Sequence, residues 1–325
     1  MMNTVKSYRP RAVRSGNPPS FQLTTRDVEI IRHVSRYRFL KSDHIKRLVP
    51  GSPKNINNRL KGLFEHWFLD RPECQFETYR MGGGTSPLVY ALADKGARVL
   101  MNEHGGKRMS WTHKNKSANR PFLQHTLATA DFAVSLRLAV AGRDDVELIE
   151  NIELVENFPA TTRALNKPYR LNVPVIRQSA RMDIGVEPDY AFALYLPKVK
   201  RRAFFLVEID QGSMPVVRKN LNQSSILRKI LAYQTMWKSK RHNQHFGWRN
   251  FRVLFVTTNP ERVKNMIACA NNHALTKGSP LFLFADKAGL YEKESLLAKP
   301  FLNCNSNELH LIPMLRKSDT SQFYF

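Results

Sequence analysis

The segment EPDYAFALYLPKVKRRAFFLVEIDQGS, residues 187–213, decides how the second half of this 325-residue chain folds. It holds two runs rich in aromatic and aliphatic residues, Glu187–Leu196 and Ala203–Asp210, on either side of a cationic stretch. Apolar runs of this length, bounded by charged or proline-containing turns, predict two β-strands. Side chains two residues apart on a strand share a face, so we expect Glu208 and Asp210 on one side.

Helical and extended patterns alternate around these two strands. This alternation is typical of an α/β domain with a mixed central sheet, which we place at residues 121–325. The role of residues 301–325 is open, although HLIPML (310–315) is a candidate for an added strand. The expected elements are a helix at 121–140, strands at 147–156, 187–196 and 203–210, a helix at 219–238, a strand at 251–257, a helix at 260–273 and a strand at 281–284.

Residues 21–104 predict a smaller unit with a different pattern. Three helices, each preceded by a Ser or Thr that can cap it, are followed by a glycine-tipped hairpin and a closing helix. This order predicts a winged helix-turn-helix, a module that places its third helix in the DNA major groove. The expected helices are 24–36, 42–48, the helix capped by Ser52 and 94–102, and the expected extended stretches are 76–80 and 88–92, separated by Gly82–Gly84.

The third helix, beginning at Ser52, separates an apolar face from a polar one. The polar face carries no acid, and Asn and Arg side chains can pair with the edges of adenine and guanine. A winged helix used for protein contacts is the alternative. The expected DNA-binding residues of this helix are Lys54, Asn55, Asn58 and Arg59.

The charge of the chain favours a polyanionic partner. Lys and Arg number 51 against 27 Asp and Glu, which gives a net charge of +24. Nucleic acid is the first candidate and an anionic membrane the second. No apolar run approaches the roughly 18 residues that span a bilayer, and the first residues lack the apolar core of a secretory signal. Cys74, Cys269 and Cys304 are too far apart to indicate a disulfide framework or a zinc site, so we expect a cytoplasmic protein.

Basic segments flank both units. Residues 1–20 predict a disordered basic arm, either lying along phosphates or simply solvated, and residues 105–120 predict a basic linker. Two cationic clusters of the second domain, the later one interleaved with aromatic residues, suit phosphate contact and stacking on unpaired bases. The alternative is a solvated loop with Trp248 in the core. The expected DNA-binding residues of these clusters are Lys200, Arg201, Arg202, Lys240, Arg241 and Arg249.

The second domain resembles the core of the PD-(D/E)XK nuclease superfamily. Pro188-Asp189, Glu208-Ile209-Asp210 and the helix segment KILAYQ (229–234) carry the resemblance. It implies Mg²⁺ or Mn²⁺ held by Asp189 and Glu208, since both ions prefer oxygen ligands. The superfamily places Lys two residues after the Glu, where this chain has Asp210. We expect Lys229 to supply the missing cation with Asp210 assisting, and Asp131 to be a further acid.

Residues 21 to about 260 also resemble the replication-relaxation family of plasmid and mobile-element proteins. The resemblance implies a DNA-binding protein acting in plasmid replication, in mobilisation or in a relaxosome, and it leaves catalysis open. It is carried by LTTRDVEIIRHVSRYRFLKSDHIKRL (23–48), SPKNINNRLKGLFEHWFLDR (52–71), VYALADKGARVL (89–100), QHTLATADFAV (124–134), EPDYAFAL (187–194), FFLVEIDQGS (204–213) and KILAYQ (229–234).

Three functions follow from the sequence. The first is a DNA-binding protein that cuts or nicks DNA with Mg²⁺ or Mn²⁺. The second is a binding module with an inactive nuclease-like fold, serving as a relaxosome accessory or transcription regulator, and the missing Lys favours it. The third is a protein-interaction scaffold. The expected partners are double-stranded DNA, single-stranded DNA and other relaxosome or replication proteins, with an oligomer as one arrangement and no membrane.

Overall fold

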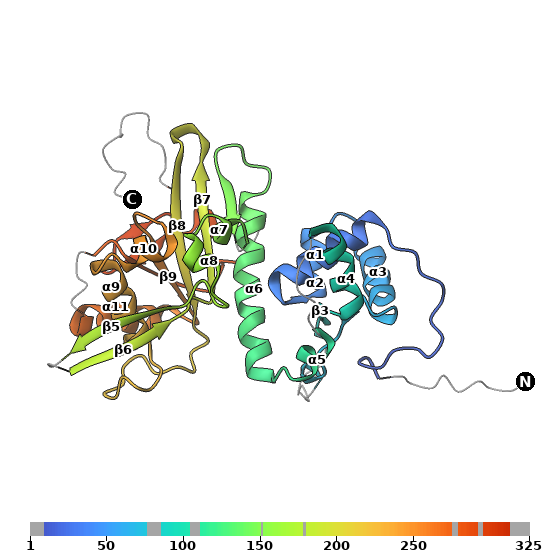
Figure 1. Cartoon of the computed structure of the whole chain (residues 1–325), viewed down its shortest axis with the longest axis horizontal. Coiled ribbons are helices and arrows are strands. Elements are labelled where there is room, and N and C mark those ends of the chain that lie inside the picture. Colours follow the sequence, from blue (N-terminus) through green and yellow to red (C-terminus); the bar gives the residue numbers. More distant parts are fainter. Residues whose placement is uncertain are drawn as a thin grey trace, which may run out of the picture. The chain divides into compact units, whose positions relative to one another are not determined.

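The computed structural model describes residues 10–76, 86–104, 111–150, 152–177, 180–274, 279–291 and 295–312. The chain divides into two compact units, residues 1–134 and 135–325, and α6 (Arg120–Val140) contributes to both (Figure 1). The division therefore falls inside α6 and later than the linker predicted at 105–120. Within that stretch, residues 111–116 form the helix α5 (Trp111–Lys116).

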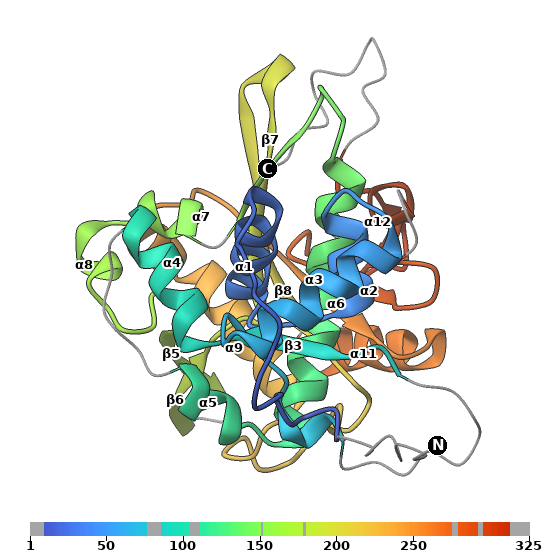
Figure 2. The ribbon, with the colours of Figure 1, turned by 90° about the vertical axis from the view of Figure 1, so that its right-hand side faces the viewer.

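The first unit combines short helices with a three-stranded antiparallel sheet (Figure 2). The strand order is β1-β3-β2, so the strand before the second helix pairs with the strand before the closing helix. The extended stretch predicted at 76–80 lies outside the described residues except for Phe76. The elements are α1 (Thr25–Tyr37), β1 (Phe39–Lys41), α2 (Ser42–Leu48), α3 (Pro53–Glu65), β2 (Leu69–Asp70), the 3-10 helix Glu73–Gln75, β3 (Val89–Leu92) and α4 (Asp94–His104).

Helix α5 belongs to the first unit because its polar residues are bonded there. Backbone N–H groups of Trp111 and Thr112 donate to Asp94 Oδ1, which caps the helix. Asn115 is buried and donates to Asp70 Oδ2 at 3.0 Å and to the Leu92 carbonyl at 2.8 Å. The basic composition of this segment predicted a linker, but the buried Asn115 side chain bonds it to strands β2 and β3.

A seven-stranded mixed sheet forms the second unit. Its order is β12-β11-β10-β9-β8-β7-β4, in which β8, β9 and β10 are parallel and the other neighbours antiparallel. The mixed α/β class is therefore confirmed. The strands are β4 (Glu147–Glu150), β7 (Tyr190–Leu196), β8 (Arg201–Ile209), β9 (Arg252–Thr257), β10 (Phe282–Asp286), β11 (Phe301–Asn303) and β12 (Glu308–Leu309).

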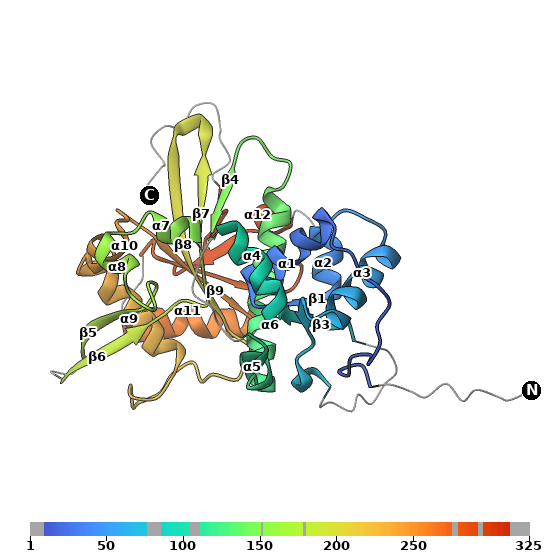
Figure 3. The same ribbon diagram turned by 45° about the vertical axis from the view of Figure 1, so that its right-hand side comes forward.

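Helices pack on this sheet, and a separate two-stranded ribbon packs on one of them. Ser225 caps α9 (Ile226–Lys238) by accepting from the Arg228 N–H, and apolar residues of α9 share one core with the sheet and with α11 (Pro260–Ala274). The ribbon β5 (Leu171–Arg177) and β6 (Ala180–Val186) runs along α9 (Figure 3). The shorter helices are α7 (Ile152–Glu156), α8 (Ala160–Arg163), the 3-10 helix Pro197–Val199, α10 (Arg241–Phe246) and α12 (Ser295–Ala298).

Two sequence predictions about this unit are wrong. The strand expected at 147–156 ends at Glu150, and α7 follows it. The helix expected from residue 219 begins at Ile226 instead. All three cysteines are buried free thiols, and no helix of the described part of the chain has the length and apolar character to cross a membrane.

Candidate functional site

Asp189 and Glu208 lie next to each other where β7 begins and β8 ends. The strands are antiparallel with Tyr190 opposite Val207, so the two acids face each other one step further along. The Asp189 N–H donates to the Val207 carbonyl at 3.0 Å, and Asp189 Oδ2 accepts from the Ile209 N–H at 2.8 Å. Asp189 is thus bonded to both chain neighbours of Glu208, and the two acids expected together are together.

Glu208 is sealed from solvent by two residues of α9. Its side chain is 2% exposed, Lys229 Nζ donates to Oε2, and the Tyr233 hydroxyl donates to Oε1 at 2.5 Å. Burial raises the pKa of Glu208 to about 7 despite the attraction of Lys229, and the charge of Asp189 raises it further. Burial works to lower the pKa of Lys229, but Glu208 and Asp189 outweigh it and raise that pKa overall. The cluster is thus a buried Lys229–Glu208 ion pair in which the second carboxylate oxygen of Glu208 accepts a hydrogen bond from Tyr233.

Asp210 has a different set of partners from Glu208. Arg262 of α11 donates to both of its carboxylate oxygens, from Nε to Oδ2 at 2.5 Å and from Nη2 to Oδ1 at 2.9 Å. The Thr257 hydroxyl donates at 2.5 Å and the Gly212 N–H at 3.2 Å. Asp210 therefore joins the ends of β8 and β9 to the first turn of α11. It was expected to assist catalysis, and its observed contacts are those of a structural carboxylate.

The Asp189–Glu208 pair does not fit a bound divalent ion in this arrangement. Carboxylate oxygens are the ligands that Mg²⁺ and Mn²⁺ prefer. However, both Glu208 oxygens already accept bonds, one of them from a cation. Within the described ranges, no group of three or more His, Cys, Asp or Glu side chains is placed to hold a metal. The cation bonded to Glu208 Oε2 is the Lys229 ammonium.

Three residues of this region were missed by the sequence predictions. Tyr233 was expected on the inward face of this helix, one helical turn from Lys229, but no role was assigned to it. Arg262 is far from Asp210 in sequence and gave no signal. Glu150, at the end of β4, is fully buried between Arg137 Nη2 at 3.0 Å and the Tyr190 hydroxyl at 2.7 Å.

In the first unit, helix α3 exposes three of the four residues expected to bind DNA. Lys54, Asn55 and Asn58 are exposed, and the one acid of the helix, Glu65, is buried. Ser52 caps the helix by accepting from the Asn55 N–H at 3.3 Å. The structure thus leaves a polar helical face free of negative charge.

Arg59, the fourth residue, is engaged inside the protein. Its Nε donates to Asp27 Oδ1 at 2.9 Å, its Nη2 donates to Asp27 Oδ2 and to the Gln22 carbonyl at 2.7 Å, and the guanidinium lies over the Phe21 ring. Asp27 is completely buried and also forms the capping box of α1 with Thr24. These contacts fix α3 to α1, which is a structural use of a residue expected to contact bases.

The chain before Phe21 is ordered against α3 from residue 10 onward. Arg14 donates to the Phe64 carbonyl at 2.7 Å, to the Leu69 carbonyl at 2.9 Å and to Asp70. Its guanidinium stacks 3.7 Å from the centre of the Trp67 ring. The prediction of a disordered arm is therefore wrong for residues 10–20, and residues 1–9 lie outside the described residues.

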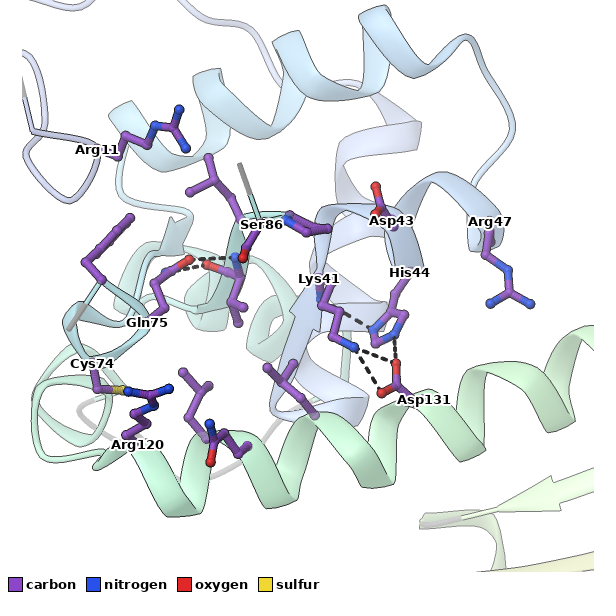
Figure 4. A pocket seen from close by; sticks show the side chains of 17 residues that line it. Arg11, Lys41, Asp43, His44, Arg47, Cys74, Gln75, Ser86, Arg120 and Asp131 are labelled. Atoms are coloured by element: carbon purple, nitrogen blue, oxygen red, sulfur yellow. Dashed lines mark hydrogen bonds and ion pairs between the residues drawn. The ribbon is translucent and has the colours of Figure 1, made fainter. Parts of the chain in front are cut away.

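A cleft of about 790 Å³ beside α2 holds a cluster of charged side chains (Figure 4). Asp131 accepts from Lys41 Nζ at 2.8 and 2.9 Å and from His44 Nε2 at 2.6 Å. The Lys41 N–H donates to His44 Nδ1 at 3.3 Å, so the ring proton sits on Nε2. Asp131 was expected as a further acid of the nuclease-like site, but it belongs to this cleft of the first unit.

A second cleft, of about 800 Å³, lies at the start of β8 and collects four of the six cations expected in the second unit. These are Lys200, Arg201, Arg202 and Arg249. Lys240 and Arg241 do not line it, and Arg241 donates instead to the Asn172 carbonyl at 3.0 Å. Trp248 is buried, as the alternative interpretation of this region held.

The fold and these two clefts define an α/β protein with basic surfaces in both units. The sequence model of the replication-relaxation family matches residues 31–250, which is more than half of the chain. The protein therefore belongs to the replication-relaxation family, as the sequence resemblance indicated. This membership indicates a role in the replication of a plasmid or another mobile element. Comparisons with curated proteins and with solved structures each returned no match.

Proposed function

We propose that this protein binds double-stranded DNA through the exposed face of α3 and acts, beside other replication or relaxosome proteins, without cutting the DNA. The observation that carries the proposal is the face formed by Lys54, Asn55 and Asn58, which is exposed and free of acids. Asn pairs with the adenine edge, and Lys contacts phosphate or guanine. The net charge of +24 supplies the long-range attraction to a polyanion.

The order of elements in the first unit supports the same function. A helix, a short strand, two further helices and two strands, with the first strand paired to the last, is the order of a winged helix-turn-helix. In that module the third helix enters the major groove. Helix α3 is the third helix here, and Arg59, one helical turn after Asn55, anchors it to Asp27 of α1.

DNA cleavage is the second candidate function, favoured by one observation. Asp189, Glu208 and Lys229 come together from two strands and a helix, as the PD-(D/E)XK resemblance implies. The sealed state of the Glu208 carboxylate argues against it, because a nuclease needs that carboxylate open to an ion and a phosphate. We therefore assign the cluster a structural rather than a catalytic role in the second unit.

Binding of a labelled duplex, followed by fluorescence anisotropy, tests the first proposal. We expect log Kd to rise steeply with log salt concentration, by roughly 0.9 per phosphate contacted, and a flat response would contradict DNA binding. Lys54→Ala/Asn55→Ala is expected to weaken binding about tenfold or more, since a base contact contributes about 1–3 kcal/mol.

The chain offers a matched control on another exposed helix. Lys264→Ala/Asn265→Ala makes the same chemical change on α11, where both side chains are exposed. We expect this control to bind the duplex as the wild type does. Equal losses in the two variants would show that α3 has no special part in binding.

Incubation of supercoiled plasmid with Mg²⁺ or Mn²⁺ separates binding from cleavage. We expect the wild type and Glu208→Gln to leave the plasmid equally intact, since Gln has the size of Glu and retains hydrogen-bonding groups for Lys229 and Tyr233. Metal-dependent nicking by the wild type that disappears in a folded Glu208→Gln variant would replace our proposal with the nuclease alternative.

A further inference from the structure

The cleft at the start of β8 has a lining suited to nucleic acid. Five cations line it and, among the described residues, neither Asp nor Glu does. Lys200, Arg201, Arg202 and Arg249 are exposed, and Arg252 is half-buried. Cations gathered in a concave site attract a polyanion, because their charges add at the same place.

The position of the cleft separates it from the Glu208 cluster. The parallel strands β8 and β9 run from the same side of the sheet, with Arg252 opposite Phe205, and both Arg201 and Arg252 line the cleft there. Glu208 lies at the other end of β8, seven residues from Arg201, which corresponds to about 20 Å along an extended strand. The β7–β8 hairpin projects beyond the other described elements of this unit in all three views (Figures 1, 2 and 3). These cations therefore do not serve the buried ion pair.

Aromatic rings line the same cleft. Tyr195 and Trp237 are half-buried, so part of each ring faces solvent. Phe204 also lines the cleft and stacks on the buried Trp248 with ring centres 4.6 Å apart. The Arg202 guanidinium lies 5.8 Å from the centre of the Tyr195 ring. Partly open rings beside cations can stack on bases while the cations hold the backbone.

We infer that this cleft binds single-stranded DNA, with phosphates on Lys200, Arg201, Arg202 and Arg249 and an unpaired base on Trp237 or Tyr195. A duplex hides the faces of its bases, so the aromatic lining selects an unpaired strand. The inference rests on the proposed function in taking DNA as the partner, and it adds a second site for a different form of DNA. A protein with one site for duplex and one for single strand can hold both at a partly opened origin or nick.

Anisotropy of a labelled oligothymidylate with the full chain tests the inference. Arg201→Glu/Arg202→Glu reverses two exposed cations of the cleft, and we expect affinity to fall about tenfold or more. Lys198→Glu/Lys264→Glu is the matched control, because it changes the net charge equally at exposed positions outside the cleft lining. Wild-type affinity in the first variant, or an equal loss in both, would overturn the inference.

Tryptophan fluorescence gives a second measurement that does not depend on charge. Oligothymidylate is expected to quench the emission of Trp237, and Trp237→Phe should abolish most of the quenching while keeping a ring for stacking. Trp67 and Trp111 belong to the first unit, and Trp248 is buried. Quenching that persists unchanged in Trp237→Phe would place the strand elsewhere.

A duplex measured in parallel separates this inference from the proposed function. We expect Arg201→Glu/Arg202→Glu to lose more affinity for oligothymidylate than for duplex, and Lys54→Ala/Asn55→Ala to show the reverse. If the α3 variant alone bound its DNA like the wild type, the proposed duplex site would be contradicted and the cleft would stand. If the cleft variant alone bound oligothymidylate like the wild type, the single-strand site would be contradicted and the duplex site would stand.

Discussion

Arg59 of α3 forms a two-pronged ion pair with Asp27 of α1, whose carboxylate is completely buried. Burial works to raise the pKa of Asp27, but the bonds from Arg59 and Thr24 outweigh it and lower that pKa. The carboxylate therefore stays ionised at neutral pH, and its charge depends on Arg59. This pair sets the orientation of α3, and with it the direction in which Lys54 and Asn55 point.

Arg59→Ala is expected to destabilise the first unit by about 3–5 kcal/mol, since removing one partner leaves a buried charge uncompensated. Arg59→Lys keeps the charge without the planar fork and should fall between the wild type and Arg59→Ala. Urea unfolding measures both. Lys54→Ala is the control and should shift stability by less than about 0.5 kcal/mol. Unfolding of Arg59→Ala at the wild-type urea concentration would show that the pair contributes little.

Glu208 is expected to make stability depend on pH between about 4.5 and 7. Its pKa is raised to about 7 in the folded protein, so the folded state binds this proton more tightly than the unfolded chain. Stability should therefore fall as pH rises through this window, by up to about 3 kcal/mol, and level off above it. Unfolding of the wild type and Glu208→Gln across pH isolates this contribution. Parallel curves for the two proteins would contradict the assignment.

Asp210→Lys places a lysine where the nuclease pattern has one, and it is expected to destabilise the protein without creating nuclease activity. The new cation would face Arg262, whose side chain is 16% exposed, and would remove its carboxylate partner. The cost is expected at about 3–5 kcal/mol. The exchanged pair Asp210→Lys/Arg262→Glu should recover part of it, and thermal unfolding compares the three proteins. A stable Asp210→Lys variant that nicks plasmid with Mg²⁺ would refute this view of Asp210.

Asp131 is expected to add stability that is lost in acid. Burial works to raise its pKa, but bonds from His44 and Lys41 outweigh it and lower that pKa. Its contribution is thus complete above its ordinary pKa of 3.8 and disappears as pH falls through the lower folded value. Asp131→Asn should be less stable than the wild type at pH 7, by about 1–3 kcal/mol, and the difference should shrink below pH 4. A constant difference across this range would show that the carboxylate charge is irrelevant.

The parts of the fold that follow from periodicity were predictable, because strand alternation and helical spacing determine local geometry. The meeting of Glu208 and Lys229 was expected from the resemblance to the PD-(D/E)XK superfamily and not from periodicity. The ribbon at 171–186 was missed because its apolar residues alternate with polar ones and Pro174 interrupts the first strand, so no continuous apolar run marks it.

Partnerships between distant residues were not predictable. Arg59 and Asp27 are 32 residues apart, and Arg262 and Asp210 are 52 apart. A basic residue on a polar helix face looks the same in sequence whether it meets DNA or a buried carboxylate. Asp27 becomes buried only when α1 and α3 pack together, and this burial makes Arg59 its partner rather than a DNA contact.

Arg14 holds the segment before Phe21 against the end of α3, and proteolysis of this segment would therefore change the behaviour of the purified protein. Proteolytic cleavage after Phe21 would remove Arg14. The Phe64 ring would then lose the guanidinium that covers it, and Asp70 would lose its ion-pair partner. The newly exposed aromatic surface would favour aggregation. The less ordered end of α3 would lower the apparent DNA affinity of the shortened chain. A preparation checked by mass spectrometry for an intact leading segment avoids mistaking such damage for weak affinity.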